Sequence, residues 1–331
     1  ALLLFPPGLD FIKAFVGCAL AGCPSVPLSI PRARQSLSGL EKIANDCGAK
    51  AVLCTQAVSG ILKSRIPKGS LLDRLVWINV DELDDSEQAF FTVPPSQYSF
   101  PVFLQYTSGS TGTPKGVVVS SENLLHNLRN IASLFRFTEG STVVSWLPHF
   151  HDMGLVGSIL TSLYAGAQCI LLSPVDFIQK PYRWLKAVSE YGGTLAGAPN
   201  FAYDLCVSKI RGEQVDTLDL RSWGLAWNGA ETIRASTIAA FAEHFRRAGF
   251  RKEAFAPCYG LAEATLMVTG CGADKENKII SITQSSHLSG ESVELAEAPS
   301  AETQELVGCG QSFSDQSVRI ADAALLVSLP D

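Results

Sequence analysis

The chain has 331 residues, of which 47% are hydrophobic and 18% charged, enough for two ordinary domains or one large α/β domain with a sizeable core. This composition argues against disorder, and a formal net charge of -6 argues against a nucleic-acid partner, which would need a basic face. We find no run that is apolar and long enough to span a bilayer, so an integral membrane protein is not expected. The opening ALLLF is too short for a signal-peptide core, and the cytoplasm is the expected location.

The nine cysteines are scattered through the chain. They form no C-x-x-C pair, and no set of cysteines and histidines has the spacing of a zinc site. We therefore expect buried free thiols in a reducing compartment and no disulfide framework.

Short apolar runs of strand type alternate with helical patterns over most of the chain. The expected strands are residues 1–5, 25–30, 51–55, 74–80, 102–107, 116–120, 142–147, 167–172, 193–198 and 223–229. The expected helices are residues 9–22, 37–47, 123–135, 181–191, 200–210 and 233–249. This alternation predicts an α/β fold with a parallel sheet covered by helices on both faces. Residues 274–305 are polar and lack a clear period, which indicates an insertion or a long loop.

The segment LQYTSGSTGTPKGVVVS, residues 104–120, places a loop rich in Gly, Ser and Thr between two expected strands. Gly109 and Gly112 allow backbone geometries closed to other residues, and successive N–H groups in such a loop form an anion-binding concavity. Lys115 adds a positive charge, and the hydroxyls add donors, so the loop predicts a cradle for a polyphosphate. The residues of this predicted cradle are Thr107, Ser108, Gly109, Ser110, Thr111, Gly112 and Lys115.

Other loops fit this segment less well. The Walker pattern G-x-x-x-x-G-K-S/T fails because Pro114 precedes Lys115 and Gly116 follows it. A nucleophile elbow, G-x-S-x-G, fails because Ser108 stands at its first glycine, and the Rossmann G-x-G-x-x-G fails on spacing. A mobile Gly/Ser linker would need no lysine and is not expected between two apolar strands.

Residues 106–116 resemble the phosphate loop of the adenylate-forming superfamily, which comprises acyl-CoA synthetases, peptide-synthetase adenylation domains and luciferases. That loop reads Tyr or Phe, T-S-G, Ser or Thr, then T-G-x-P-K-G, and this sequence fits it throughout. The segment NGAE at 228–231 follows an apolar strand, where the family binds adenine, and YGLAEAT at 259–265 resembles the next core motif. The resemblance implies that Tyr259 stacks on adenine and that Glu263 holds Mg²⁺ against the phosphates of ATP.

The resemblance assigns further residues of the site. The nucleotide-binding residues that it implies outside the loop are Asn228, Gly229, Ala230, Glu231, Tyr259, Gly260, Leu261 and Ala262. The catalytic residues that it implies are Thr107, Lys115, His151 and Glu263, with Glu263 as the metal ligand. By itself, Glu263 would be an ordinary exposed residue at the start of a helix, and a lone histidine would be a structural hydrogen-bonding group. Within the family, we expect His151 to close the acyl pocket beside the reacting carboxylate.

Longer stretches are similar to one branch of that superfamily, the fatty acyl-AMP ligases. These stretches are residues 3–22, 147–157, 197–206, 227–231 and 249–270. The polar stretch after residue 270 falls where this branch carries an insertion associated with forming acyl-adenylates without coenzyme A. The resemblance implies ATP-dependent conversion of a fatty acid to acyl-AMP with release of pyrophosphate. The acyl group would then pass to the phosphopantetheine of an acyl carrier protein in a polyketide or lipopeptide pathway.

Two alternatives to this function stay open. One is a long-chain fatty acyl-CoA ligase, and the other is a truncated, non-catalytic fragment that binds ATP or an acyl group. Residues 152–164 and 199–206 are candidate walls of an apolar acyl tunnel, and plain core packing would explain them equally well.

The resemblance also divides the chain into parts of the family's large domain. Residues 1–100 would be a first α/β part, residues 101–270 the nucleotide- and acyl-binding part, and residues 271–320 the ligase-specific insertion and the start of the following β region. Both ends read as cut from something longer. The ribose-binding Gly-Asp motif, the hinge and the small C-terminal domain with its catalytic lysine are expected to be absent from this sequence.

Overall fold

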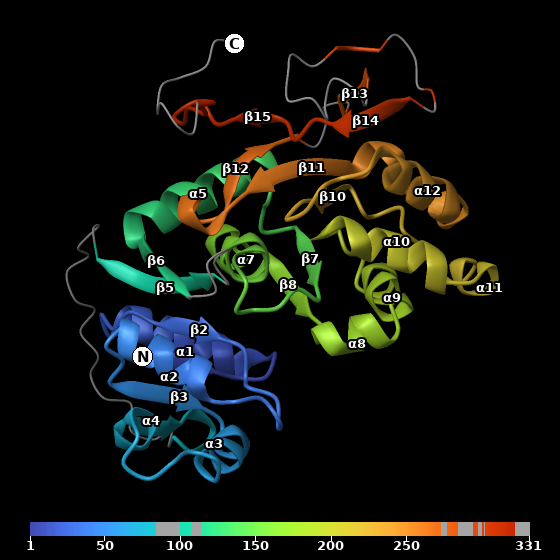
Figure 1. Ribbon diagram of the computed structural model, residues 1–331. Helices are drawn as coiled ribbons and strands as arrows, with labels where there is room; N and C mark the ends of the chain where they lie inside the picture. The colour runs from blue at the N-terminus through green and yellow to red at the C-terminus, as the bar shows by residue number, and fades with distance from the viewer. Residues whose placement is uncertain are drawn as a thin grey trace. The chain divides into compact units, whose positions relative to one another are not determined.

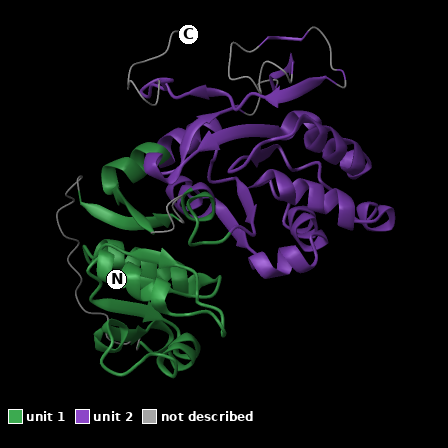
Figure 2. Cartoon of the chain, viewed as in Figure 1, with its two compact units in different colours: residues 1–127, 148–156 green, residues 128–147, 157–331 purple. Residues whose placement is uncertain are grey.

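A computed structural model describes residues 1–83, 100–107, 114–272, 277–283, 294–296, 300 and 302–321 (Figure 1). The chain forms two compact units (Figure 2). Unit 1 comprises Ala1–Asn127 and Pro148–Val156, and unit 2 comprises Leu128–Leu147 and Gly157–Asp331. None of the helices in the described ranges combines the length and the apolar content that crossing a bilayer would need.

A four-stranded parallel sheet organises the first part of unit 1, in the order β2-β1-β3-β4. The three leucines of the inner strand β1 (Leu2–Leu4) are fully buried, as expected for a parallel strand that is covered on both faces. The other strands are β2 (Val26–Leu28), β3 (Ala51–Cys54) and β4 (Val76–Asn79). The helices are α1 (Leu9–Leu20), α2 (Ser38–Asp46), α3 (Gln56–Lys63) and α4 (Leu71–Arg74), followed by the 3-10 turn η1 (Val80–Glu82).

The hairpin of β5 (Pro101–Thr107) and β6 (Lys115–Ser120) also belongs to unit 1, and α5 (Ser121–Leu134) follows it directly. Tyr106 and Gly116 are opposite each other in this antiparallel pair, and a Cβ at position 116 would lie 2.8 Å from Cζ of Tyr106. The Tyr106 hydroxyl donates to the carboxylate of Asp46 at the end of α2. Glycine at position 116 thus leaves room for a ring that anchors the hairpin.

A seven-stranded sheet organises unit 2, in the order β15-β12-β11-β10-β9-β7-β8 (Figure 1). Strands β11, β10, β9, β7 and β8 run parallel, whereas β12 pairs antiparallel with both β11 and β15. The strands are β7 (Thr142–Ser145), β8 (Gln168–Leu171), β9 (Leu195–Ala198), β10 (Leu225–Asn228), β11 (Phe255–Gly260), β12 (Met267–Gly270) and β15 (Gln311–Ser312).

The helical elements after β7 come in several short pieces. They are α6 (Asp152–Gly154), the π-helix η2 (Leu155–Leu160), α7 (Thr161–Ala165), α8 (Pro174–Gln179), α9 (Tyr182–Glu190), α10 (Asn200–Lys209), α11 (Gly212–Val215) and α12 (Ala235–Phe245). The 3-10 turns are η3 (Arg246–Ala248), η4 (Lys252–Ala254) and η5 (Ala262–Ala264). Helices α10 and α12 lie side by side (Figure 1).

The core of unit 2 is rich in aromatic side chains. Trp184 and Trp223 are fully buried with their ring centroids 5.2 Å apart, and Tyr203 meets Phe241 edge to face at 5.0 Å. Such pairs contribute about 0.5–1.5 kcal/mol each beyond the burial of their area. The Tyr203 hydroxyl donates to the carbonyl of Trp227 at 2.7 Å, so its polar atom is satisfied inside the core.

The prediction of an α/β fold with mostly parallel sheets is confirmed, and all nine cysteines are free, as expected. The polar region predicted as an insertion or long loop contains two strands, β13 (Ile279–Thr283) and β14 (Thr303–Val307), which pair antiparallel. The helix expected over residues 233–249 is α-helical only to Phe245, and a 3-10 turn leads to Gly249, which has a φ of 89°. Glycine at that position ends the helix in the left-handed conformation.

His149 is a buried side chain of unit 1, with 5% of its surface exposed. Its ring centroid lies 4.3 Å from that of Phe11. Burial disfavours the charged imidazolium and lowers the pKa of His149 to about 4, while the backbone of Phe5 opposes this shift only in part. His149 is therefore a neutral aromatic core residue.

We expect Gly116→Ala to destabilise unit 1 by about 1–3 kcal/mol, because the new methyl group would displace the ring of Tyr106. The matched control is Gly60→Ala in α3, where a Cβ would meet no atom within 4 Å and where alanine is the better helix former. Urea unfolding of both variants measures the difference. Equal stability of the two variants would contradict the close contact at position 116.

We expect the free energy of unfolding to fall as the pH is lowered from about 6.5 to about 4, with a contribution from His149 of up to about 3 kcal/mol. In this window the unfolded chain binds a proton that folded His149 does not, so the stabilisation present above pH 6.5 is lost. Urea unfolding of the unaltered chain and of His149→Leu across this range isolates the effect. The free energy of unfolding of His149→Leu should depend less on pH than that of the unaltered chain. The same pH dependence in both proteins would rule out a buried neutral ring.

Candidate functional site

The β5–β6 hairpin carries the ends of the predicted phosphate loop. Thr107 and Lys115 form its last cross-strand pair, with Thr107 half-buried and Lys115 exposed. The register therefore brings these two predicted site residues together at the base of the loop. The residues predicted between them, Ser108, Gly109, Ser110, Thr111 and Gly112, lie outside the described residues.

The histidine segment is attached to the same hairpin within unit 1. The side-chain amide of Gln105 on β5 donates to the carbonyl of Phe150 at 2.9 Å. His151 is the N-cap residue of α6, and its Nδ1 lies 2.7 Å from Oδ1 of Asp152. This carboxylate raises the pKa of His151 against the opposing effect of burial. The side chain of His151 is about half exposed, in contrast to the buried and neutral His149.

The NGAE segment forms the turn after β10 in unit 2. Asn228 ends β10 and is fully buried, and a Cβ at Gly229 would lie 2.9 Å from the carbonyl oxygen of Cys258 on β11. Glycine is therefore needed for the turn to pack against the neighbouring strand. Ala230 has a φ of 68°, a left-handed conformation that costs a residue with a Cβ about 1–2 kcal/mol. Strain of this kind persists only where the surroundings hold it and is typical of ligand sites.

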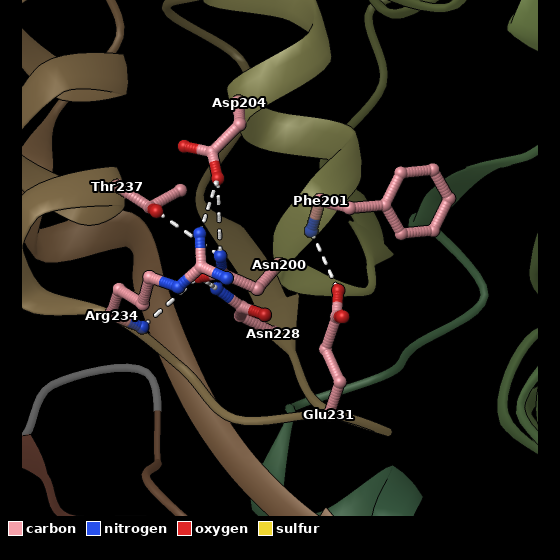
Figure 3. Close-up of polar contacts among 7 residues, drawn as sticks. All are labelled: Asn200, Phe201, Asp204, Asn228, Glu231, Arg234 and Thr237. Atoms are coloured by element: carbon pink, nitrogen blue, oxygen red, sulfur yellow. Dashed lines mark hydrogen bonds and ion pairs between the residues drawn. The ribbon is translucent and has the colours of Figure 1, made fainter.

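Residues at the start of α10 hold this turn (Figure 3). Glu231 accepts the N–H of Phe201 at 2.6 Å, and Asn200 accepts the N–H of Arg234 at 3.1 Å. Glu231, which the sequence predicted to bind the nucleotide, thus accepts a hydrogen bond from the first turn of α10. Asn200 is a polar residue of the site that sequence analysis missed. The available signal was an amide side chain directly after the strand and proline of GAPNF, where a helix begins.

Tyr259 lies near the end of β11, one residue before Gly260, and 53% of its side chain is exposed. An exposed aromatic ring on a short strand offers a face for stacking. Strands β9, β10 and β11 are parallel neighbours, with Ala198 paired to Asn228 and Asn228 paired to Pro257. Because ligands of α/β proteins bind beyond the carboxyl ends of parallel strands, the 228–231 turn and Tyr259 meet at such an edge.

A tight loop follows Tyr259 and carries the predicted metal ligand. The N–H of Leu261 donates to the carbonyl of Leu266 at 2.8 Å, which closes the loop around the 3-10 turn η5. Glu263 is exposed on that turn, and Ala262 before it is buried. Thr265 has φ 71° and ψ -56°, a conformation that is unusual for a β-branched residue. Two strained residues, Ala230 and Thr265, thus flank the candidate site.

The chemistry of Glu263 fits the metal that the sequence predicts. Mg²⁺ takes oxygen ligands, keeps several waters and commonly binds through one or two carboxylates together with substrate phosphates. Within the described ranges, no three side chains of His, Cys, Asp or Glu gather as a metal site. An exposed carboxylate beside the predicted nucleotide site is compatible with a metal that arrives with the phosphates.

Most side chains of the two candidate acyl-tunnel walls are buried in the hydrophobic core. In residues 199–206, Tyr203 and Cys206 are fully buried, whereas Phe201 is 43% exposed. In residues 152–164 the chain passes through the π-helix, a rare element that often marks functional sites, and only Leu163 and Tyr164 among its large apolar side chains are exposed. The tunnel stays a prediction.

The predicted site residues fall into two groups by unit. Asn228, Gly229, Ala230, Glu231, Tyr259, Gly260, Leu261, Ala262 and Glu263 belong to unit 2, and Thr107, Lys115 and His151 belong to unit 1. Within each unit, the residues of the group lie on adjacent strands or on the segments attached to them.

Comparisons with known proteins show the family. A family model of the AMP-binding enzymes matches residues 1–331. The medium-chain fatty acid–acyl carrier protein ligase JamA of Moorena producens is 40% identical over 273 residues, which cover 81% of this chain and 46% of that protein. The corresponding ligase TtuA of Teredinibacter turnerae is 33% identical over 367 residues, covering 100% of this chain and 57% of that protein.

A solved structure is similar over nearly the whole chain. The fatty acyl-adenylate ligase from Legionella pneumophila, in complex with acyl adenylate and pyrophosphate, matches with a TM-score of 0.89 and 39% identity, over 99% of this chain and 57% of that one. This chain spans about half the length of these three proteins. The family match over residues 1–331 and the similarity to this solved structure lead to one assignment: the chain belongs to the AMP-binding enzyme family, with the fold of the fatty acyl-AMP ligases.

Proposed function

We propose that the protein activates a fatty acid as its acyl-adenylate, using ATP. The observation that carries this proposal is the grouping of the strained 228–231 turn, the exposed ring of Tyr259 and the carboxylate of Glu263 at the carboxyl ends of β10 and β11. The names of the related ligases and the acyl adenylate in the Legionella structure support it. One carboxylate oxygen of the fatty acid attacks the α-phosphorus of ATP, and pyrophosphate leaves with the electrons of the broken P–O bond.

The chain's own residues would contribute positioning and charge. The ring of Tyr259 would stack on adenine, and the backbone of Gly229 and Ala230 would contact its edge. Thr107 and Lys115 would bind the β- and γ-phosphates, where a fixed positive charge offsets the charge that develops on pyrophosphate. Mg²⁺, held by Glu263, would neutralise further phosphate charge.

His151 would act at the carboxylate of the fatty acid. Its position as a half-exposed ring held by Asp152 suits a side chain that orients a neighbouring group, and its raised pKa favours the charged form that attracts a carboxylate. The apolar tail would follow the segments 152–164 and 199–206.

The acceptor of the acyl group is proposed to be the phosphopantetheine of an acyl carrier protein. The names of JamA and TtuA as acyl carrier protein ligases support this choice. Coenzyme A is the alternative acceptor, and a binding fragment without turnover is the alternative to an enzyme. A cytoplasmic location is proposed as well, with nine unpaired thiols in its support.

The direct test is incubation of the purified chain with labelled ATP, Mg²⁺ and fatty acids of several lengths, followed by detection of acyl-AMP and pyrophosphate. Coenzyme A and a phosphopantetheinylated carrier protein are then added in parallel. Transfer to the carrier protein alone supports the proposed acceptor, and transfer to coenzyme A would replace it. Binding of ATP without acyl-AMP formation would leave a binding fragment as the function.

We expect Tyr259→Ala to weaken ATP binding by about 5- to 150-fold, because stacking of a base on an aromatic ring contributes about 1–3 kcal/mol. Tyr191→Ala is the matched control, since 54% of that side chain is exposed in the same unit and outside the site. Calorimetric titration with ATP and Mg²⁺ measures both affinities. Similar losses in the two variants would remove Tyr259 from the adenine site.

We expect Glu263→Gln to raise the Mg²⁺ concentration needed for half-maximal ATP binding by about tenfold or more, because a neutral amide attracts a dication less than a carboxylate does. Glu253→Gln, on the exposed 3-10 turn η4, is the control. The readout is ATP affinity across a Mg²⁺ series. An unchanged Mg²⁺ dependence in Glu263→Gln would show that another group holds the metal.

A further inference from the structure

Asn200 is a buried amide whose hydrogen-bonding capacity is fully used (Figure 3). Its Oδ1 accepts the N–H of Arg234 at 3.1 Å and the Nδ2 of Asn228 at 3.4 Å. Its Nδ2 donates to Oγ1 of Thr237 at 3.1 Å and to Oδ2 of Asp204 at 3.3 Å. Since a backbone N–H can only donate, the atom that faces Arg234 has to be the oxygen, which fixes the orientation of the amide.

The partners of Asn200 stand at both ends of the proposed adenine turn. Asn228 is the residue directly before Gly229, and Arg234 is the residue directly before α12. One oxygen atom therefore holds the start and the end of residues 229–233. Without such a hold, the left-handed Ala230 would be free to relax to a commoner conformation, because its strain favours any other state that the turn can reach.

A second hold comes from the neighbouring residue of α10. The N–H of Phe201 donates to Oε1 of Glu231, in the middle of the turn, at 2.6 Å. The residue before α10 is Pro199, whose side chain cannot cap the helix, so the carboxylate of Glu231 takes the place of a cap. The turn and the first residues of α10 thus hold each other.

The position of α10 is itself fixed by the sheet. The helix starts two residues after Ala198, the last residue of β9, and Ala198 pairs with Asn228 on β10. The start of α10 is therefore set beside the proposed adenine turn by strand register, and the aromatic core holds the helix through Tyr203.

From these contacts we infer that Asn200 is a positioning residue of the nucleotide site, which holds residues 229–233 in the strained conformation that receives adenine. The inference rests on the proposed function, because it needs a nucleotide at this turn. Asn200 acts through the backbone of the turn, and its contribution is to order the turn before the ligand arrives.

The test compares Asn200→Ala with Thr237→Val. Asn200→Ala removes the two hydrogen bonds that Oδ1 of Asn200 accepts, from Asn228 and from Arg234. Thr237→Val removes only the bond that Nδ2 of Asn200 donates to Thr237 on α12, so both bonds to the turn remain. We expect Asn200→Ala to bind ATP with Mg²⁺, and a sulfamoyl analogue of a fatty acyl-adenylate, about tenfold more weakly, which corresponds to the loss of one to two hydrogen bonds. Thr237→Val should bind both probes nearly as the unaltered chain does.

Hydrogen exchange of the chain without any ligand supplies a readout that does not depend on the proposed function. Amides of residues 229–234 should exchange faster in Asn200→Ala and at the original rate in Thr237→Val. Unchanged exchange in this segment, or equal loss of ligand affinity in both variants, would overturn the inference.

The two possible failures are distinguishable. If the unaltered chain binds neither probe, the proposed function fails and the nucleotide role of Asn200 fails with it, while the exchange data still decide whether Asn200 holds the turn. If Asn200→Ala does not fold, Asn228→Ala replaces it, because it removes one of the two hydrogen bonds that Oδ1 of Asn200 accepts from residues flanking the turn. Unchanged exchange of residues 229 and 230 in that variant would contradict the hold by the side-chain oxygen.

Discussion

The parallel pairing of β9, β10 and β11 is the constraint on which the candidate site of unit 2 depends. Register places Ala198, Asn228 and Pro257 side by side, so that three chain segments leave the sheet at one edge. One segment becomes α10, one becomes the turn after β10, and one continues to Tyr259 and the loop with Glu263. Because a shift of one residue would turn every side chain to the opposite face, where a differently shaped part of the core is packed, the register fixes this grouping.

Strain in the site is balanced by contacts from rigid elements. Ala230 and Thr265 adopt left-handed φ values on short loops. The turn with Ala230 is held by hydrogen bonds to the start of α10, and the loop with Thr265 is closed by its own bond between Leu261 and Leu266. In unit 1 the equivalent anchor is Tyr106, whose hydroxyl donates to Asp46 and whose ring lies against Gly116. In both units, candidate-site residues thus lie at the ends of well-packed strands, an arrangement that limits the motion of their backbone.

Much of the fold could be predicted because apolar strand runs and helical periods are local signals. The runs AVLC, TVVS and LAWN became β3, β7 and β10. Helices α3 and α4 were missed because, with eight and four residues, they are too short to show a helical period in the sequence. Their N-cap residues, Thr55 and Ser70, could have indicated them. Strands β13 and β14 were missed because their pairing partner is distant in a polar segment.

The residues of the site could be predicted only as far as a motif names them. Thr107, Lys115, Tyr259 and Glu263 belong to recognisable patterns, and their places on strand ends and turns follow from those patterns. The role of Asn200 depends on partners 28 to 37 residues away, at Asn228, Arg234 and Thr237, and no local pattern reports such contacts. The helix-capping contact of Glu231 was hidden for the same reason.

The π-helix Leu155–Leu160 has a consequence for how this segment tolerates changes in length. A π-turn accommodates one more residue than an α-turn, and each residue of a helix rotates the following side chain by about 100°. A chain with one residue fewer here would close the wide turn into an ordinary α-helix. Because the wide turn takes up that residue within the same turn, the side chains of α7 (Thr161–Ala165) would keep their rotational phase relative to α6, so this segment can absorb a change of one residue in length without changing which side chains enter the core.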